Sequence, residues 1–162
     1  MTATPAQDGQ ERTASSDARS EAPDPGSRSV TRWVAGGRFT ELIDDGDYDA
    51  QHVQVPVGFA TPIHLHTRYA EHLYVVRGSF KVWAAGTLRV IGPGESITIP
   101  IGSAHALLAG DEGGGAALIV SRPAGFAKVV RVSGTETEGA FDLDRFVHAA
   151  VEAGDEILDL PA

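Results

Sequence analysis

The sequence predicts an all-β fold, a sandwich or barrel of antiparallel strands with a C-terminal helix packed outside it. Between residues 30 and 122, short apolar or alternating runs recur at close spacing, and segments containing glycine or proline separate them. Such runs with turn residues between them are typical of β-sandwiches and barrels. After residue 122 the apolar residues change to a helical period. We therefore divide the chain into a β-domain, residues 30–122, and a helical extension, residues 123–162.

Nine runs in the β-domain have the length of strands. They cover residues 30–34, 39–43, 50–57, 72–77, 80–84, 88–91, 96–99, 105–108 and 116–121. Gly78 and Ser79 can form a two-residue hairpin turn with glycine in its first position, and Ala85 and Gly86 can close a second one. We therefore expect a hairpin on either side of the strand at residues 80–84.

The extension contains one clear helical pattern, at residues 142–153. Five apolar side chains recur there at the spacing of one helical stripe: Leu143, Phe146, Val147, Ala150 and Val151. Asp142 is the expected N-cap and Gly154 the expected stop. Residues 123–132 are expected to be helical or irregular. We expect the apolar stripe to pack against the outside of the β-domain.

Composition excludes several classes of protein. Residues 1–29 contain no Val, Ile, Leu, Phe, Tyr or Trp, so we predict a disordered tail that is neither a secretory signal nor a membrane anchor. No apolar run reaches the length of about 18 residues that a membrane span needs. The formal net charge of −9 disfavours binding to nucleic acid or acidic membranes. The chain has no cysteine, which excludes disulfides and thiol catalysis and is compatible with the cytoplasmic location that we expect.

Four side chains in the middle of the chain have a spacing that suits one metal ion. Residues two apart on a strand point to the same face, so His64 and His66 can both direct an imidazole into one cavity. Glu71 follows after four residues, which let the chain bend, and His105 would arrive from a distant hairpin. Three imidazoles and a carboxylate suit one divalent transition metal, Fe, Mn, Ni, Co, Cu or Zn, and leave one or two positions open for water or substrate.

Around these residues the sequence resembles the two motifs of the cupin superfamily, G-x5-HxH-x3,4-E-x6-G and G-x5-PxG-x2-H-x3-N, which begin here at Gly58 and Gly94. Every fixed position fits except the last, where Ala109 replaces the family's Asn. The resemblance implies a single-domain cupin, a double-stranded β-helix or jelly-roll barrel of about six to eight strands. It assigns the family's metal-ligand roles to His64, His66, Glu71 and His105.

The segment after residue 122 is similar to the C-terminal region of single-domain cupins related to quercetin 2,3-dioxygenases. Those enzymes bind an enolic hydroxyl at a metal and insert dioxygen. The resemblance implies that Glu71, besides ligating the metal, is the catalytic base for the substrate hydroxyl. It also implies a homodimer. Tyr74 and Trp83, which we predict on outer faces, would be covered either by the terminal helix or by the dimer interface.

Strand alternation predicts the walls of a pocket next to the metal. If Glu71 and His105 face inward, other residues of alternating parity do too, and Tyr69 lies in the bend between the ligands. The candidate substrate-binding residues are Tyr69, Leu73, Val75, Phe80 and Leu107. Apolar walls favour a small aromatic or other apolar, oxygen-bearing substrate over a phosphorylated one. The alternative is that these side chains simply fill a barrel core, with Tyr69 as a packing residue.

Three functions agree with these features. The first is a metal-dependent dioxygenase that acts on a small aromatic or enolic substrate, with the metal stabilising the developing enolate. The second is an isomerase, cyclase or lyase that uses the metal as a Lewis acid without dioxygen. The third is a ligand-binding or sensor protein without catalysis. The presence of all four ligands favours an enzyme.

Overall fold

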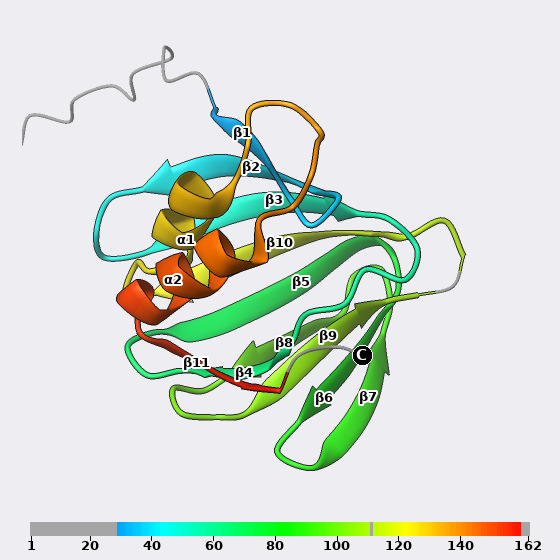
Figure 1. The fold of residues 1–162 in the computed structure, drawn as a ribbon. Helices are drawn as coiled ribbons and strands as arrows, with labels where there is room; N and C mark the ends of the chain where they lie inside the picture. The colour runs from blue at the N-terminus through cyan, green and yellow to red at the C-terminus, as the bar shows by residue number, and fades with distance from the viewer. Residues whose placement is uncertain (1–28, 111, 160–162) are drawn as a thin grey trace, which may run out of the picture.

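The structure is a computed structural model that describes residues 29–110 and 112–159. The predicted tail, apart from Ser29, lies outside the described residues. Within the described part, the chain forms two antiparallel β-sheets and two helices (Figure 1). The predicted all-β jelly-roll with helical structure outside it is confirmed.

One sheet has six strands in the order β1-β2-β3-β10-β5-β8. Its members are β1 (Thr31–Val34), β2 (Gly37–Asp44), β3 (Asp49–Val55), β10 (Gly115–Arg122), β5 (Ala70–Gly78) and β8 (Ser96–Ile99). The other sheet has five strands in the order β11-β4-β9-β6-β7. These are β11 (Asp155–Asp159), β4 (Ile63–His66), β9 (His105–Ala109), β6 (Phe80–Ala84) and β7 (Thr87–Ile91). All nine predicted runs form strands.

The core lies between the inner faces of the two sheets. Alternate residues of β5 point inward, so Leu73 and Val75 are fully buried while Tyr74 and Val76 are exposed. Val82 of β6 and Ile99 of β8 come from opposite sheets and belong to the same buried cluster. The alternation expected from the sequence therefore determines which side of each strand contributes to the core.

The two predicted hairpin turns have different outcomes. Ala85 and Gly86 join β6 to β7 with positive φ angles of 48° and 78°, which is the geometry of a tight hairpin. The prediction for Gly78 is wrong, because β5 and β6 belong to different sheets and do not pair. Gly78 has a φ of 73°, and a Cβ there would collide with the carbonyl oxygen of Gly114. The glycine thus permits a sharp corner from one sheet to the other.

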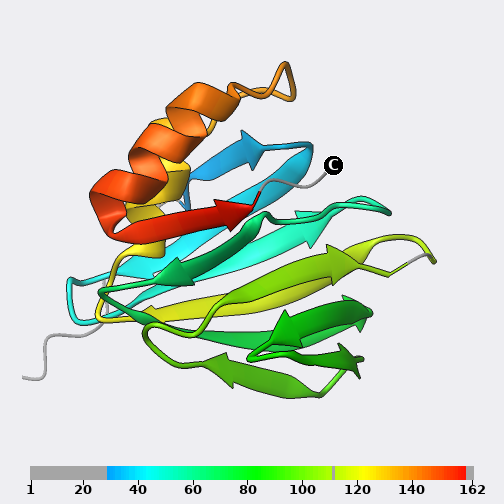
Figure 2. The same cartoon turned by 60° about the horizontal axis from the view of Figure 1, so that its bottom comes forward.

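Two helices follow β10, α1 (Phe126–Ser133) and α2 (Leu143–Ala153). Figures 1 and 2 show both helices outside the sheets, with α1 next to β1, β2 and β3, and α2 against α1. Asp142 caps α2 as predicted, because its side chain accepts a hydrogen bond of 2.9 Å from the Arg145 N–H. Gly154 ends the helix with a φ of 100°.

The predicted apolar stripe of α2 is partly wrong. Leu143 and Val151 are exposed, and the buried positions are Ala149, Ala150 and Ala153. Small side chains let α2 pack closely on α1, where Val129 belongs to the same buried cluster. The helical period therefore predicted burial for large apolar residues that lie at the exposed rim of this contact.

The strand β11 was not predicted. Its five residues, DEILD, follow the helix directly, and they pair antiparallel with β4 at the edge of the five-stranded sheet. Only the free edge of β4 makes this short acidic segment a strand. No helix in the described part of the chain is long and apolar enough to cross a membrane.

Candidate metal centre

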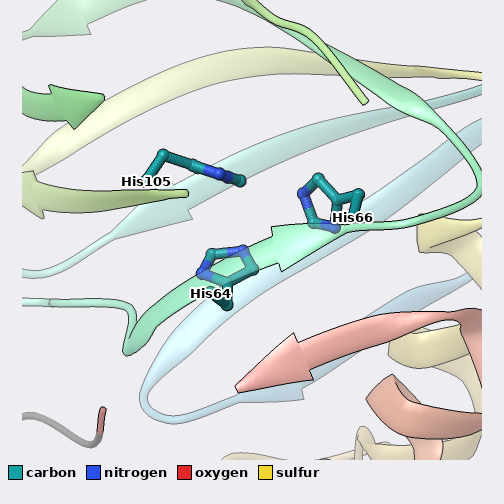
Figure 3. Close-up of side chains that lie close together, drawn as sticks. All are labelled: His64, His66 and His105. Atoms are coloured by element: carbon teal, nitrogen blue, oxygen red, sulfur yellow. The ribbon is translucent and has the colours of Figure 1, made fainter. Parts of the chain in front are cut away.

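Three histidine side chains converge between the sheets (Figure 3). His64 and His66 alternate with partly exposed neighbours on β4, so both point to the inner face. His105 begins β9 and is the Cα partner of His64 in the β4–β9 pairing. One ring nitrogen from each residue lies within 4.8 Å of the corresponding atoms of the other two. The predicted convergence of the three imidazoles is thus present, with all three side chains buried.

Hydrogen bonds fix the orientation of each ring. Nδ1 of His64 lies 2.9 Å from the Pro62 carbonyl oxygen, and Nδ1 of His105 lies 2.9 Å from that of Ser103. Because a carbonyl oxygen only accepts, both Nδ1 atoms donate, and the lone pair remains on Nε2. Nε2 of His66 and Nε2 of His105 are buried and have no hydrogen-bond partner. Buried polar nitrogens without partners are costly, and a bound metal ion would satisfy them.

Glu71 stands beside the three histidines. It lies on β5, in the opposite sheet, and is 3% exposed. Its Oε2 is 3.4 Å from Nε2 of His66, and its Oε1 has no hydrogen-bond partner. The carboxylate is not part of the group of ring nitrogens that lie within 4.8 Å of one another. Its position agrees with a fourth ligand that contacts the ion from the facing sheet, and this role remains a prediction.

The charges at the site differ from residue to residue. Burial lowers the pKa of His64, and it lowers the pKa of His105 to about 4, so both rings are neutral at pH 7. Burial also acts against a charge on His66, but the hydrogen bond with Asp155 and the nearby carboxylate of Glu71 outweigh it and raise the pKa of His66 to about 9. For Glu71, burial favours the neutral acid, yet the neighbouring imidazoles hold the pKa below its usual value.

Asp155 is the most important residue that the sequence analysis missed. It is the first residue of β11, is 6% exposed, and its Oδ1 lies 2.7 Å from Nδ1 of His66. A carboxylate behind a metal-binding histidine orients the ring and raises its basicity. The sequence offered no signal for it, because the segment followed a predicted helix stop and lies 89 residues away from His66.

An apolar cavity of about 220 Å³ opens from the metal centre between the sheets and the helices. Its walls include the predicted residues Leu73, Phe80 and Leu107. Sequence analysis missed the aromatic side chains that complete it: Phe39, Phe59, Phe126, Phe141 and Phe146. Among its described lining residues none is lysine or arginine. The extension therefore forms part of the cavity wall as well as covering the sheets.

Two of the predicted pocket residues do not line this cavity. Val75 is fully buried in the core between the sheets. Tyr69 is 1% exposed, and its ring stacks on that of His66 with centroids 4.2 Å apart and planes at 24°. Burial and the nearby carboxylates of Asp155 and Glu71 raise the pKa of Tyr69 above its ordinary value. The bend before β5 therefore turns Tyr69 behind His66, away from the cavity.

A row of buried polar residues continues from Glu71 across the six-stranded sheet. Ser121 on β10 is the Cα partner of both Glu71 and Asp49. Asp49 accepts hydrogen bonds of 2.7 and 3.2 Å from the N–H groups of Gly125 and Ala127 at the start of α1. The sequence analysis began this strand at residue 50 and so missed Asp49, which ties the extension to the sheet that holds Glu71.

Comparison with known proteins agrees with this geometry. Residues 51–121 match the family model of the cupin domain. A mannose-1-phosphate guanylyltransferase of Escherichia coli K12 is 39% identical over 68 residues, which are 41% of this chain but only 14% of that enzyme. This chain thus matches about a seventh of the length of that relative.

Solved structures share the fold over longer stretches. KdgF from Halomonas sp. has a TM-score of 0.55 and 26% identity, over 57% of this chain and 86% of its own. Pac13 of Streptomyces, a nucleoside dehydratase, has a TM-score of 0.57 and 16% identity, over 83% of this chain and 88% of its own. The matched domain includes β4, β5 and β9 with their histidines and Glu71. This protein therefore contains a cupin domain, at residues 51–121.

Proposed function

We propose that this protein is a metal-dependent dioxygenase that acts on a small aromatic or enolic hydroxyl compound. The observation that supports the proposal is a group of three histidines next to Glu71, in which His64, His66 and Glu71 line an aromatic-rich cavity. The donor set favours a transition metal, and the walls favour an apolar substrate. The alternatives, an enzyme that does not use dioxygen or a ligand-binding protein, are tested by the same experiment.

One divalent ion, Fe, Mn, Ni, Co, Cu or Zn, would be held by His64, His66 and His105, with Glu71 as the fourth ligand. Nitrogen-rich donor sets of this kind suit these metals better than Ca²⁺ or Mg²⁺, which prefer oxygen ligands. When bound, the ion would supply Lewis acidity toward a hydroxyl or carbonyl oxygen of the substrate.

Glu71 has the chemistry of a general base. The neighbouring imidazoles keep its pKa below the usual value, so the side chain is a carboxylate at neutral pH. Its Oε1 has no hydrogen-bond partner and can accept a proton from a hydroxyl group that enters the cavity. Since the surrounding walls are apolar, this proton transfer takes place away from bulk water, where electrostatic interactions are stronger.

The cavity limits the substrate class. An engineered apolar cavity of roughly 150 Å³ accommodates benzene, so about 220 Å³ suits a substituted aromatic ring. None of the described lining residues is a lysine or arginine that could pair with a phosphate. This observation favours an uncharged or weakly acidic compound. It does not support a phosphorylated substrate such as the one in the name of the guanylyltransferase.

Metal analysis and oxygen uptake test the proposal. Purified protein is analysed by mass spectrometry for bound metal, reconstituted with each candidate ion, and assayed for oxygen consumption with flavonols and single-ring enolic aromatics. We expect uptake with at least one metal and substrate, loss of uptake in His66→Ala, and strong reduction in Glu71→Gln. The exposed His148 provides the control His148→Ala, which should retain full uptake.

Other outcomes assign the site to the alternatives. Turnover of the substrate under argon would contradict the dioxygenase and point to an isomerase, cyclase or lyase. Thermal stabilisation by a compound of the panel without any turnover would indicate a binding or sensor protein.

The homodimer also stays a prediction, and apolar residues on the outer face of the five-stranded sheet support it. Leu88 and Val90 are each 63% exposed, and Leu88 is the Cα partner of Trp83. Size-exclusion chromatography with light scattering would check it, and a monomer at micromolar concentration would contradict it.

A further inference from the structure

We propose that Asp155 is a positioning residue through which docking of the C-terminal strand and metal binding at His66 stabilise each other. The proposal rests on the metal-binding part of the proposed function and does not depend on the reaction. It follows from a difference between the three histidines, and it gives a role in the site to a segment outside the cupin match at residues 51–121.

Two of the histidines are oriented locally and one is oriented from a distance. Nδ1 of His64 and Nδ1 of His105 each donate to a carbonyl oxygen two residues earlier in the chain. Nδ1 of His66 instead lies 2.7 Å from the carboxylate of Asp155, which is 89 residues later. Strand formation in the barrel is therefore enough to orient two ligands, whereas the third also needs β11 in place.

Several contacts hold Asp155 in this position. Asp155 and His66 are Cα partners in the β11–β4 pairing, so the two side chains leave the sheet side by side. The carbonyl oxygen of Gly154 accepts two hydrogen bonds from Thr67, 2.8 Å from its backbone nitrogen and 2.6 Å from its hydroxyl. Arg68 donates to the Glu152 carbonyl oxygen at 3.2 Å. The turn between α2 and β11 is thus bonded to the residues that follow His66.

The conformation of Gly154 makes this arrangement specific. Its φ of 100° turns the chain from α2 directly into β11, and a Cβ there would lie 2.7 Å from side-chain carbons of Arg68. The turn brings the first residue of β11 opposite His66, where only 6% of Asp155 is exposed. A buried carboxylate without a partner would destabilise the docked segment. The ring of His66 therefore stabilises the burial of Asp155, and Asp155 in turn orients the ring.

This mutual dependence has a thermodynamic consequence. With Nδ1 donating to Asp155, the neutral ring of His66 carries its lone pair on Nε2, the form that a metal ion binds. A metal that binds this form favours the docked state of β11, and by linkage the docked strand raises metal affinity by the same factor. The extension and the metal centre should therefore respond to each other in both directions.

Metal affinity of Asp155→Asn tests one direction. Co²⁺ or Zn²⁺ is titrated into metal-free wild type and variant in competition with a chromophoric chelator. We expect affinity to fall by about 10–100-fold, the usual effect of losing such an outer carboxylate. Glu156→Gln is the matched control, because it removes a charge from the next, exposed position of the same strand and should bind metal as wild type does.

Hydrogen exchange tests the other direction. In wild type, adding the metal should slow exchange of the backbone amides of residues 155–159, and in Asp155→Asn this metal-dependent protection should be lost. A residue that only stabilises the fold would leave that difference in place. Thr67→Val provides a second variant if Asp155→Asn does not fold, since it weakens docking at Gly154 without removing the Asp155 carboxylate, and it should lower metal affinity several-fold.

Unchanged metal affinity in both Asp155→Asn and Thr67→Val would overturn the proposal. It would also be overturned if adding metal to wild type did not change the exchange rates of the β11 amides. Neither measurement uses a substrate or oxygen. The proposal can therefore hold when no dioxygenase activity is found, and it can fail when activity is present.

Discussion

The metal centre is surrounded by two regions of the chain that are built in different ways. The barrel region, β4, β5 and β9, supplies the histidines and Glu71 from strands whose inward faces follow from simple alternation. The extension, residues 123–159, supplies Asp155 and aromatic side chains of the cavity wall from two helices and one added strand. We propose that the first region selects the ion and that the second orients one ligand and limits what kind of molecule fits beside it.

This difference shows how a common metal-binding barrel can acquire a specific site. The three imidazoles lie within the matched cupin domain, residues 51–121, whereas Asp155, Phe126 and Phe146 lie beyond it. One fold can support many reactions, because the residues around a conserved centre vary. Here those residues come from a segment that closes one side of the barrel.

Removing a ligand of the barrel region should have the largest effect. In His105→Ala one of the three converging imidazoles is missing. Losing a residue that only hydrogen-bonds to a metal ligand lowers metal affinity by up to roughly 100-fold, so losing the ligand itself should lower it further. Metal content after dialysis, measured by mass spectrometry, checks this. A variant that retains stoichiometric metal would show that the barrel region does not form the site.

Core truncations compare the stability of the two regions. Ile99→Ala removes a side chain that is 1% exposed in the barrel core and should lower the free energy of unfolding by about 2–5 kcal/mol. Phe146 is only partly buried against the helices, so Phe146→Ala should cost less than the roughly 3–5 kcal/mol of a fully buried phenylalanine. Urea unfolding followed by circular dichroism measures both. A larger loss in Phe146→Ala would mean that the extension is the more tightly packed region.

The pH dependence of metal binding should reflect the histidine that pairs with the extension. The pKa of His66 is raised to about 9, whereas those of His64 and His105 are lowered. At pH 7 only His66 must lose a proton to bind a metal, so affinity should rise about tenfold per pH unit and level off above about pH 9.

Calorimetric titration in buffers of different ionisation enthalpy should detect release of about one proton per ion at pH 7. The same titration of His148→Ala serves as control, because His148 is exposed on α2 and is not one of the three converging histidines. Affinity that does not change between pH 6 and 8 would contradict the assignment of the proton to His66.

The smallest effect is expected at the start of α2. Asp142→Ala removes the side chain that accepts from the Arg145 N–H and should lower the free energy of unfolding by about 1 kcal/mol. Asp142→Ser, which restores a capping oxygen, should recover most of the loss in the same thermal unfolding measurement. Equal losses in the two variants would show that the cap does not stabilise α2.

The sequence predicted the barrel region well because its features are local. Alternation on β5 and the His64–His66 pair on β4 depend only on the period of a strand, and every predicted strand is present. The N-cap at Asp142 and the stop at Gly154 depend on single residues next to a helix. The corner at Gly78 was wrongly predicted as a hairpin, since a glycine with positive φ fits both and only the partners of the strands distinguish them.

By itself, the sequence determined that strands would alternate between buried and exposed side chains and that three imidazoles would face one interior with Glu71 close by. These properties follow from the geometry of a strand and from residue chemistry. The tertiary structure decided that Asp155 would lie behind His66, that Tyr69 would turn away from the cavity, and that helices would form its wall. The contact between Asp155 and His66 joins residues 89 apart in the chain, and it exists because the free edge of β4 pairs with a short segment that has no strand signal of its own.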